Sequence, residues 1–260
     1  MQGKSKWSRI IGAAVLAVAS MTGLSHADEK LNIAVIPKGT SHVYWKAVEA
    51  GAKQAGEELG VNIIYKGPVK EDDRAGQISV VEQFVGDKVS AIVLAPLDTN
   101  ALRRPVKSAM DKKIPVVIID SALAGKPGED FVSYVATNNK LGGQMAGEQL
   151  VKILGGKGKV VLLRYVQGSA STAEREEGFL EVMKKNSGIT MLVDNRFGGA
   201  SISEAQASSQ NLLDQLRQAD GVFCPNESST LGMLGALRRR GWRARFTSWV
   251  LMRRRRSSLR

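Results

Sequence analysis

The sequence predicts two α/β lobes, each built on a doubly wound parallel sheet. From residue 31 onward, short runs of Val, Ile and Leu alternate with longer segments whose apolar residues recur at helical spacing. The apolar runs are continuous rather than alternating, which is typical of strands that helices cover on both faces. A chain that repeats strand and helix in this way forms parallel strands joined by helical crossovers.

Eight strands are expected in chain order. They are residues 31–36, 61–65, 91–95, 115–120, 131–137, 159–164, 189–194 and 221–224. Between the first two strands, apolar residues fall at helical spacing at Val43, Ala47, Ala50, Ala55 and Leu59. The next helix shows the same spacing at Ile78, Val81, Phe84 and Val85. Gly60 and Gly86 stand where these two helices should stop, and Pro115 precedes the fourth strand.

A change of structural unit is expected near residues 137–139, where a strand runs directly into a helix over 141–154. The flexible segment Gly155-Gly156-Lys157-Gly158 follows that helix. Four strand–helix units precede this point and three follow it. The sequence therefore predicts an N-terminal lobe over 28–137 and a C-terminal lobe over 138–237, with a ligand cleft between them.

The N-terminus has the pattern of a secretory signal peptide over residues 1–27. Basic residues precede an apolar stretch over 10–24, and Ser25-His26-Ala27 matches a small-x-small cleavage site. We expect cleavage near Ala27. The alternative is a retained membrane anchor, but the apolar stretch is short for a span of about 20 residues.

The formal net charge of +12 is concentrated at the two ends of the chain. Three basic residues lie in the signal and ten arginines lie in residues 238–260, and neither segment contains an acid. The body between them is near neutral, which does not favour a polyanionic partner. The only cysteine, Cys224, has no partner for an intramolecular disulfide and lies in an apolar run, so we interpret it as a small buried hydrophobe.

Catalytic signatures are mostly absent from the sequence. There is no phosphate-binding loop with G-x-x-x-x-G-K-[ST], no G-x-G-x-x-G after the first strand and no G-x-S-x-G elbow. Once the signal is removed, His42 is the sole histidine, which leaves little material for a zinc site or a catalytic triad. The sequence therefore predicts a protein that is not an enzyme and has no cofactor and no metal site.

Polar and aromatic side chains follow several predicted strands, at the edge where open parallel sheets bind ligands. Aromatic rings can stack on the C–H faces of a sugar, and Asp, Asn and Arg can hydrogen-bond its hydroxyls. This chemistry favours a sugar site. The candidates are His42, Tyr44, Trp45, Asp98, Asp120, Ser121, Thr137, Asn138, Arg175, Phe197, Asn226 and Glu227.

Several candidates have a structural alternative. Tyr44 and Trp45 could be core residues of the first helix, although adjacent positions cannot both face the core. Arg175 lies among acids at 174–177, where a surface ion pair is the usual interpretation. Three candidates could instead cap helices, namely Asp98, Asn138 and Asn226.

Taken in order, these motifs resemble the ribose-type periplasmic sugar-binding proteins. Those proteins have the type I periplasmic-binding fold and serve ABC importers. The resemblance covers about residues 31–237. It is carried by the strand, aromatic pair and helix over 31–60, then AIVLAP at 91–96, PVVIID at 115–120, VATNN at 135–139 with Gly142-Gly143, EREEGF at 174–179 and GVFCPNE at 221–227.

The resemblance implies a role for each ligand residue. Tyr44 and Trp45 would stack on the sugar beside His42, Phe197 would stack from the second lobe, and Asn226 would bind from its last strand. From opposite lobes, Asp120 and Arg175 would bind hydroxyls, while Thr137 and Asn138 would line the hinge. Two departures argue against ribose itself: Ala95 stands where ribose binders have a ligand-contacting Asn, and Ser121 where they have an Arg.

The predicted function is the periplasmic substrate-binding component of an ABC-type sugar importer. A monomer would capture a monosaccharide between its lobes by hinge closure and present it to a membrane permease, with no nucleic-acid partner. The alternative is a sugar-sensing protein of the same fold, either repressor-like or feeding a chemoreceptor. The signal peptide argues against a repressor, which would begin with a DNA-binding domain.

After Leu237 the family pattern is expected to stop, and we hypothesise that a frameshift near residues 238–241 truncates the second lobe. Codons can be chosen for residues 241–257 and one further serine that also encode a second sequence in a shifted frame. Read from the third base of the first codon, they begin with Leu-Ala-Gly-Lys-Val-His-Phe-Val-Gly-Phe-Asp, which resembles the missing strand. Trp249 followed by Val250 forces Gly in that frame. Resequencing tests this, because an in-frame readout would contradict it.

If the frame is shifted, the chain lacks a strand, an expected Asp ligand and the returning segments of the family, so we expect weak stability and impaired binding. The competing interpretation is a functional basic tail over 238–260 that binds nucleic acid or anionic lipid. An exported chain meets little nucleic acid, which argues against the first of these partners.

Overall fold

The computed structural model describes residues 30–238, 244–247 and 250–253. The chain separates into Met1–Lys30 and a compact unit over Leu31–Arg260, and the description below concerns the second unit. The predicted signal peptide lies outside the described residues. Among the helices that are described, none combines the length and the apolar character needed to cross a bilayer.

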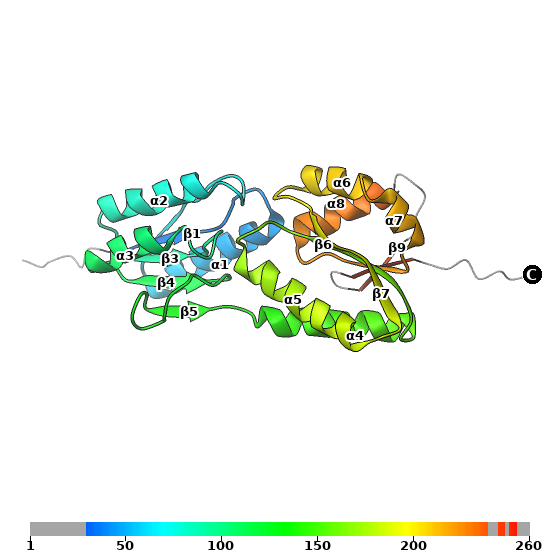
Figure 1. The fold of residues 1–260 in the computed structure, drawn as a ribbon. Helices are drawn as coiled ribbons and strands as arrows, with labels where there is room; N and C mark the ends of the chain where they lie inside the picture. Colours follow the sequence, from blue (N-terminus) through cyan, green and yellow to red (C-terminus); the bar gives the residue numbers. More distant parts are fainter. Residues whose placement is uncertain (1–29, 239–243, 248–249, 254–260) are drawn as a thin grey trace, which may run out of the picture. The chain divides into compact units, whose positions relative to one another are not determined.

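The first lobe is built on a five-stranded sheet in which all strands are parallel (Figure 1). The strand order is β2-β1-β3-β4-β5, so the order reverses between β1 and β3. The strands are β1 (Asn32–Ile36), β2 (Asn62–Tyr65), β3 (Ala91–Leu94), β4 (Val116–Ile119) and β5 (Ser133–Val135).

Three helices belong to this lobe: α1 (Val43–Leu59), α2 (Arg74–Gly86) and α3 (Arg103–Asp111). Their buried residues and those of the strands form one core, which includes Ile36, Phe84, Ile92 and Ile118. Gly60 ends α1 in the left-handed conformation with φ of 68°, as expected of a helix C-cap. Gly86 is the last residue of α2, and Asp87 provides the cap.

The second lobe has its own five-stranded sheet with the order β7-β6-β8-β10-β9. Three of its strands are mutually parallel, namely β6 (Gly158–Arg164), β7 (Ile189–Phe197) and β8 (Gly221–Phe223). Two further strands extend this sheet: β10 (Val250–Arg253) pairs antiparallel with β8, and β9 (Ala244–Thr247) pairs antiparallel with β10. The prediction of parallel sheets is therefore correct for the strands before residue 238. The Arg-rich segment, for which no strand was predicted, contributes the two antiparallel pairs.

Five helices complete the second lobe: α4 (Asn139–Leu154), α5 (Ala170–Lys185), α6 (Ile202–Gln210), α7 (Leu213–Gln218) and α8 (Glu227–Arg238). Helices α4 and α5 pack directly against each other, as do α6 and α8 (Figure 1). The α4–α5 contact is very close because glycine stands at both crossing positions. A Cβ atom at Gly143 would lie 2.0 Å from the carbonyl oxygen of Arg175, and one at Gly178 would lie 2.0 Å from that of Lys140.

The eight predicted strands before residue 238 are confirmed, with ends that differ by a few residues. The apolar pattern proposed for the first helix is wrong, because Val43 and Leu59 are exposed in α1. The face of α1 that is buried carries Trp45 and Gly56 instead. The pattern in α2 is correct for Val81, which is fully buried. Because α1 is rich in alanine, its sequence has two similar apolar faces, and the position of the sheet decides which face is buried.

Candidate ligand-binding site

A cavity of about 350 Å³ lies at the carboxyl ends of the strands and is lined by residues of both lobes. In a sheet of order 2-1-3-4-5, the first and third strands diverge at their carboxyl ends and leave a crevice there. Both sheets reverse order in this way, the first at β1 and β3 and the second at β6 and β8. Eight of the twelve candidate residues line the cavity: His42, Tyr44, Trp45, Asp120, Thr137, Arg175, Asn226 and Glu227.

The aromatic pair at the start of α1 forms one wall of the cavity. The two rings meet edge to face, with centroids 4.9 Å apart. Trp45 is buried, whereas Tyr44 is about half exposed. The hydroxyl of Tyr44 donates to Oδ1 of Asp120 at 3.0 Å. Burial, together with the charge of Asp120, raises the pKa of this hydroxyl, so it remains a donor at neutral pH.

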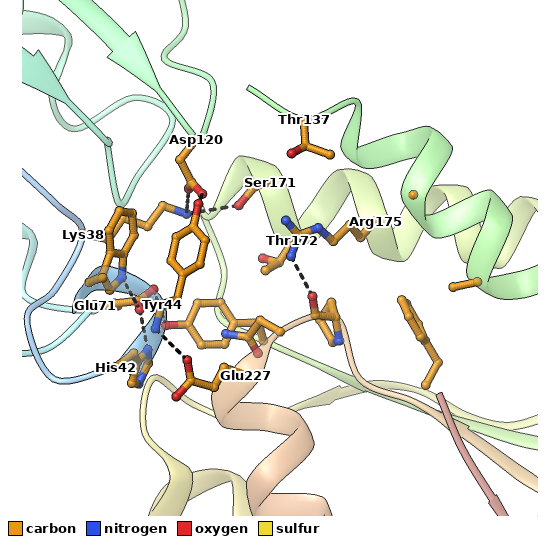
Figure 2. A pocket seen from close by; sticks show the side chains of 17 residues that line it. Lys38, His42, Tyr44, Glu71, Asp120, Thr137, Ser171, Thr172, Arg175 and Glu227 are labelled. Atoms are coloured by element: carbon orange, nitrogen blue, oxygen red, sulfur yellow. Dashed lines mark hydrogen bonds and ion pairs between the residues drawn. The ribbon is translucent and has the colours of Figure 1, made fainter. Parts of the chain in front are cut away.

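Asp120 is the central acceptor of the first lobe (Figure 2). It follows β4 in the left-handed region with φ of 64°, a conformation that Asp tolerates better than most residues. Its Oδ2 lies 3.4 Å from Nζ of Lys38 and 2.9 Å from Oγ of Ser121. The buried Lys38 ammonium also donates to the hydroxyls of Ser169 and Ser171 at 3.1 and 3.2 Å. A carboxylate and an ammonium are thus held together at the floor of the cavity, each with further hydrogen bonds.

Arg175 is the main cation from the second lobe. Its Nε donates to Oδ1 of Asn139 at 2.9 Å, and one terminal nitrogen donates to the carbonyl oxygen of Pro225 at 2.9 Å. Both acceptors are uncharged, and α5 orients the guanidinium so that it lines the cavity (Figure 2). A guanidinium carries five N–H donors, so Arg175 keeps donors for a ligand after these two bonds. The surface ion pair suggested by its acidic neighbours is not what the structure shows.

Glu71, in the loop before α2, is a buried carboxylate with three donors. It accepts hydrogen bonds from Nδ1 of His42, from Nε1 of Trp45 at 2.7 Å and from the hydroxyl of Tyr165 at 3.0 Å. Burial acts to raise the pKa of Glu71, but the bond from His42 and the charge of Lys38 outweigh it, so the pKa lies below its usual value. The same bond to Glu71 raises the pKa of His42.

Four candidate residues do not line the cavity. Asp98 accepts hydrogen bonds from Arg74 and from the backbone N–H groups of Asn100 and Ala101. Ser121 is fully buried beneath Asp120, where its hydroxyl joins Asp120 to Ser171. Asn138 is the N-cap of α4, and its side chain accepts a hydrogen bond from the backbone N–H of Leu141. This is the helix-capping role that the sequence analysis gave as the alternative to ligand binding. Phe197 ends β7 and is 39% exposed. Because β7 is an edge strand, its end lies away from the crevice at β6 and β8.

The sequence analysis missed several lining residues. Lys38, Glu71 and Tyr165 come from loops, and Ser171 and Thr172 come from the start of α5. Lys38 could have been found, because it follows the first strand at the edge that selected the other candidates. Glu71 begins the acidic run Glu-Asp-Asp, which has the appearance of a solvated surface loop. Nothing local distinguishes a buried carboxylate from an exposed one in such a run.

Raising the pH is expected to remove a stabilising contribution of His42. The hydrogen bond to Glu71 is the main cause of its raised pKa, and the charges of Glu71 and Glu227 and the Ala200 carbonyl add to it. The contribution is therefore complete below pH 6.5 and lost as the pH rises through the higher folded-state pKa. Because Glu71 has a lowered pKa, it stays ionised throughout this window.

The measurement is the difference in melting temperature between the wild type and His42→Gln from pH 6 to pH 9. We expect the difference to be largest at pH 6 and to shrink as the pH rises. Parallel curves across this window would contradict the assignment of the raised pKa to His42.

Cys224 is buried and unpaired, as predicted. Burial raises the pKa of its thiol, which disfavours the reactive thiolate. Among the residues that the structure describes, no group of three or more His, Cys, Asp or Glu side chains is placed to hold a metal ion.

Two doubly wound α/β lobes with a polar, aromatic-lined cavity at their carboxyl edges define the class of two-lobed binding proteins. Residues 33–251 match the family model described as periplasmic binding protein domain, and the chain belongs to this family. The match continues past Leu237 into the Arg-rich segment, so the family resemblance extends farther than the sequence analysis predicts.

Individual relatives are similar over most of the chain. The D-ribose/D-allose-binding protein of Pseudomonas aeruginosa is 30% identical over 246 residues, which cover 90% of this chain and 76% of that protein. The periplasmic component of an ABC-type sugar transport system from Hahella chejuensis has a TM-score of 0.76 and 34% identity, covering 80% of this chain and 76% of that one. An ABC transporter solute-binding protein of Agrobacterium vitis, bound to α-D-tagatopyranose, has a TM-score of 0.75 and 31% identity, covering 82% of this chain and 73% of that one.

Proposed function

We propose that this protein captures a monosaccharide between its two lobes and is the periplasmic substrate-binding component of an ABC-type sugar importer. The observation that carries the proposal is the composition of the cavity. Asp120 from the first lobe and Arg175 from the second lobe line the same space, beside the aromatic wall of Tyr44 and Trp45. A ligand that bonds to both lobes stabilises the closed state, which is what capture by closure requires.

The chemistry of the cavity supports a sugar. A volume of about 350 Å³ lies at the lower end of the range for small-molecule sites. Aromatic rings can stack on the C–H faces of a sugar ring, while carboxylate, ammonium and guanidinium groups form charge-assisted hydrogen bonds with hydroxyls. Since Lys38 and Asp120 pair with each other, the floor of the cavity suits an uncharged ligand.

The relatives support the importer role and a periplasmic location. One is named for binding ribose and allose, and another holds α-D-tagatopyranose. Transport would consist of binding, closure and delivery to a membrane permease, without chemical change of the sugar. Ala95 is fully buried and does not line the cavity, so it offers no polar contact where ribose binders have Asn. The sugar that this cavity binds is therefore to be identified by screening a panel of sugars.

The test is a thermal-shift screen of the full chain against aldopentoses, aldohexoses and ketohexoses, followed by calorimetric titration of each sugar that stabilises it. We expect one sugar or a few stereochemically related sugars to raise the melting temperature saturably, because binding to the folded state alone stabilises it. The sugar should be recovered unchanged. Stabilisation would also contradict the expectation of impaired binding, whereas a flat response to every sugar would contradict capture by this chain.

A further inference from the structure

Most of the hydrogen bonds that the first lobe donates to the second lobe are accepted by one turn of the second lobe. This turn, residues 165–171, runs from the end of β6 into the first helical turn of α5 and receives hydrogen bonds from several different parts of the first lobe. Arg74 donates to the carbonyl oxygen of Gln167 at 2.8 Å, and the backbone N–H of Thr99 donates to the carbonyl oxygen of Gly168 at 3.0 Å. Lys38 bonds to two serine hydroxyls of the same turn.

The contact between Glu71 and Tyr165 differs from the others in this turn. The other hydrogen bonds to this turn are accepted by backbone carbonyl oxygens or by serine hydroxyls at the floor of the cavity. Glu71 instead bonds to the side chains of His42 and Trp45, which line the cavity. Figure 2 shows His42 beside Glu71. Its second oxygen, Oε2, accepts from the hydroxyl of Tyr165 in the other lobe. One carboxylate therefore bonds to two ligand-site residues of the first lobe and to one residue of the second.

We propose that Glu71 is a positioning residue that couples the seating of Trp45 and His42 in the ligand cavity to lobe closure through Tyr165. The inference rests on the proposed function, because it concerns how the same cavity is assembled. Glu71 and Tyr165 are both more than nine-tenths buried, so their bond is shielded from solvent. A carboxylate has acceptor sites for all three donors at once, so the bond to Tyr165 can form without releasing Trp45 or His42.

The three hydrogen bonds to Glu71 differ in whether they can form in the open state or only in the closed state, and this difference determines their effect on ligand affinity. The bonds from Trp45 and His42 lie within the first lobe and can form when the lobes are apart. The bond from Tyr165 forms only when the lobes meet, so it stabilises the closed state alone. Apparent ligand affinity falls when the binding-competent state becomes less populated, so losing this bond weakens binding by lowering the population of the closed state.

The test compares Tyr165→Phe with Tyr134→Phe in the full chain. Tyr134 is a partly buried residue of β5 whose hydroxyl has no hydrogen bond among the described residues, so its variant removes a hydroxyl without removing a cross-lobe bond. We expect Tyr165→Phe to weaken sugar binding about tenfold, from the loss of one hydrogen bond to a charged group. The loss should appear in the dissociation rate, while the association rate stays unchanged.

A double-mutant cycle separates coupling from general damage. Glu71→Gln should weaken binding more than Tyr165→Phe and should also slow association, because Trp45 and His42 lose their common acceptor. Adding Tyr165→Phe to Glu71→Gln should then cost less than it does in the wild type. Additive losses in this cycle, or equal behaviour of Tyr165→Phe and Tyr134→Phe, would overturn the proposal.

A measurement without sugar separates this inference from the proposed function. Dyes on cysteines introduced at the exposed Lys107 and Lys184 report the distance between the lobes, and the buried Cys224 should remain unlabelled. We expect Tyr165→Phe to lengthen the mean distance relative to wild type and Tyr134→Phe. If no sugar binds but the distance lengthens, the proposed function fails and the coupling stands. An unchanged distance together with no effect on binding overturns the coupling.

Discussion

Replacing Gly143 with alanine is expected to lower the free energy of unfolding by about 2–3 kcal/mol, a cost typical of overpacking. The added Cβ would lie 2.0 Å from the carbonyl oxygen of Arg175 and 2.7 Å from its carbonyl carbon. These are backbone atoms of α5, so relief requires the two helices to separate rather than one side chain to rotate. For a chain of this size, the loss corresponds to a fall in melting temperature of roughly 5–10 °C.

Gly142→Ala is the matched control for this substitution. It lies one residue earlier on α4, and its added Cβ would have no atom within 4 Å. Alanine is the better helix former, so this variant should raise the free energy of unfolding by up to about 1 kcal/mol. Its melting temperature should therefore stay the same or rise. Equal melting temperatures for Gly142→Ala and Gly143→Ala would contradict the close approach of α4 and α5.

Asp120→Asn is expected to weaken sugar binding about 10- to 100-fold, because hydrogen bonds to a charged acceptor contribute more than neutral ones. The change keeps the size of the side chain and its tolerance of the left-handed backbone, while it removes the negative charge that Lys38 and Tyr44 bond to. The buried Lys38 loses its anionic partner, so the variant should also melt at a lower temperature than the wild type.

Calorimetric titration with the sugar identified by the panel measures this effect. Asp111→Asn is the control, since Asp111 is an exposed carboxylate in a surface ion pair with Lys107 on α3. Surface pairs of this kind contribute little, so binding and melting temperature should both stay close to wild type. Unaltered sugar affinity in Asp120→Asn would show that Asp120 does not contact the ligand.

The candidate site was only partly predictable from the sequence. The rule that ligands bind at the carboxyl ends of parallel strands selected Asp120 and Arg175, and the structure places both in one cavity. The same rule also selected Phe197, which lies at the end of an edge strand and outside the cavity. Strand ends can be read from a sequence, but the order of strands within a sheet cannot, and the order decides which ends flank the crevice.

The partners of charged side chains were less predictable than their positions. Arg175 is surrounded by acids in sequence, yet it bonds to an amide oxygen and a carbonyl oxygen from distant elements. Glu71 is part of an acidic run and becomes the buried acceptor of three donors from two lobes. Such partners are separated by tens of residues along the chain, so no local pattern records them.

The sequence by itself determined the eight strands before residue 238 and the absence of familiar catalytic motifs, because these depend on composition and spacing along the chain. Only the tertiary structure decided the exposed face of α1, the floor of the cavity around Lys38 and the link from Glu71 to Tyr165. Burial and hydrogen bonding depend on which surfaces meet in space, and distant segments meet only after the sheets and lobes have formed.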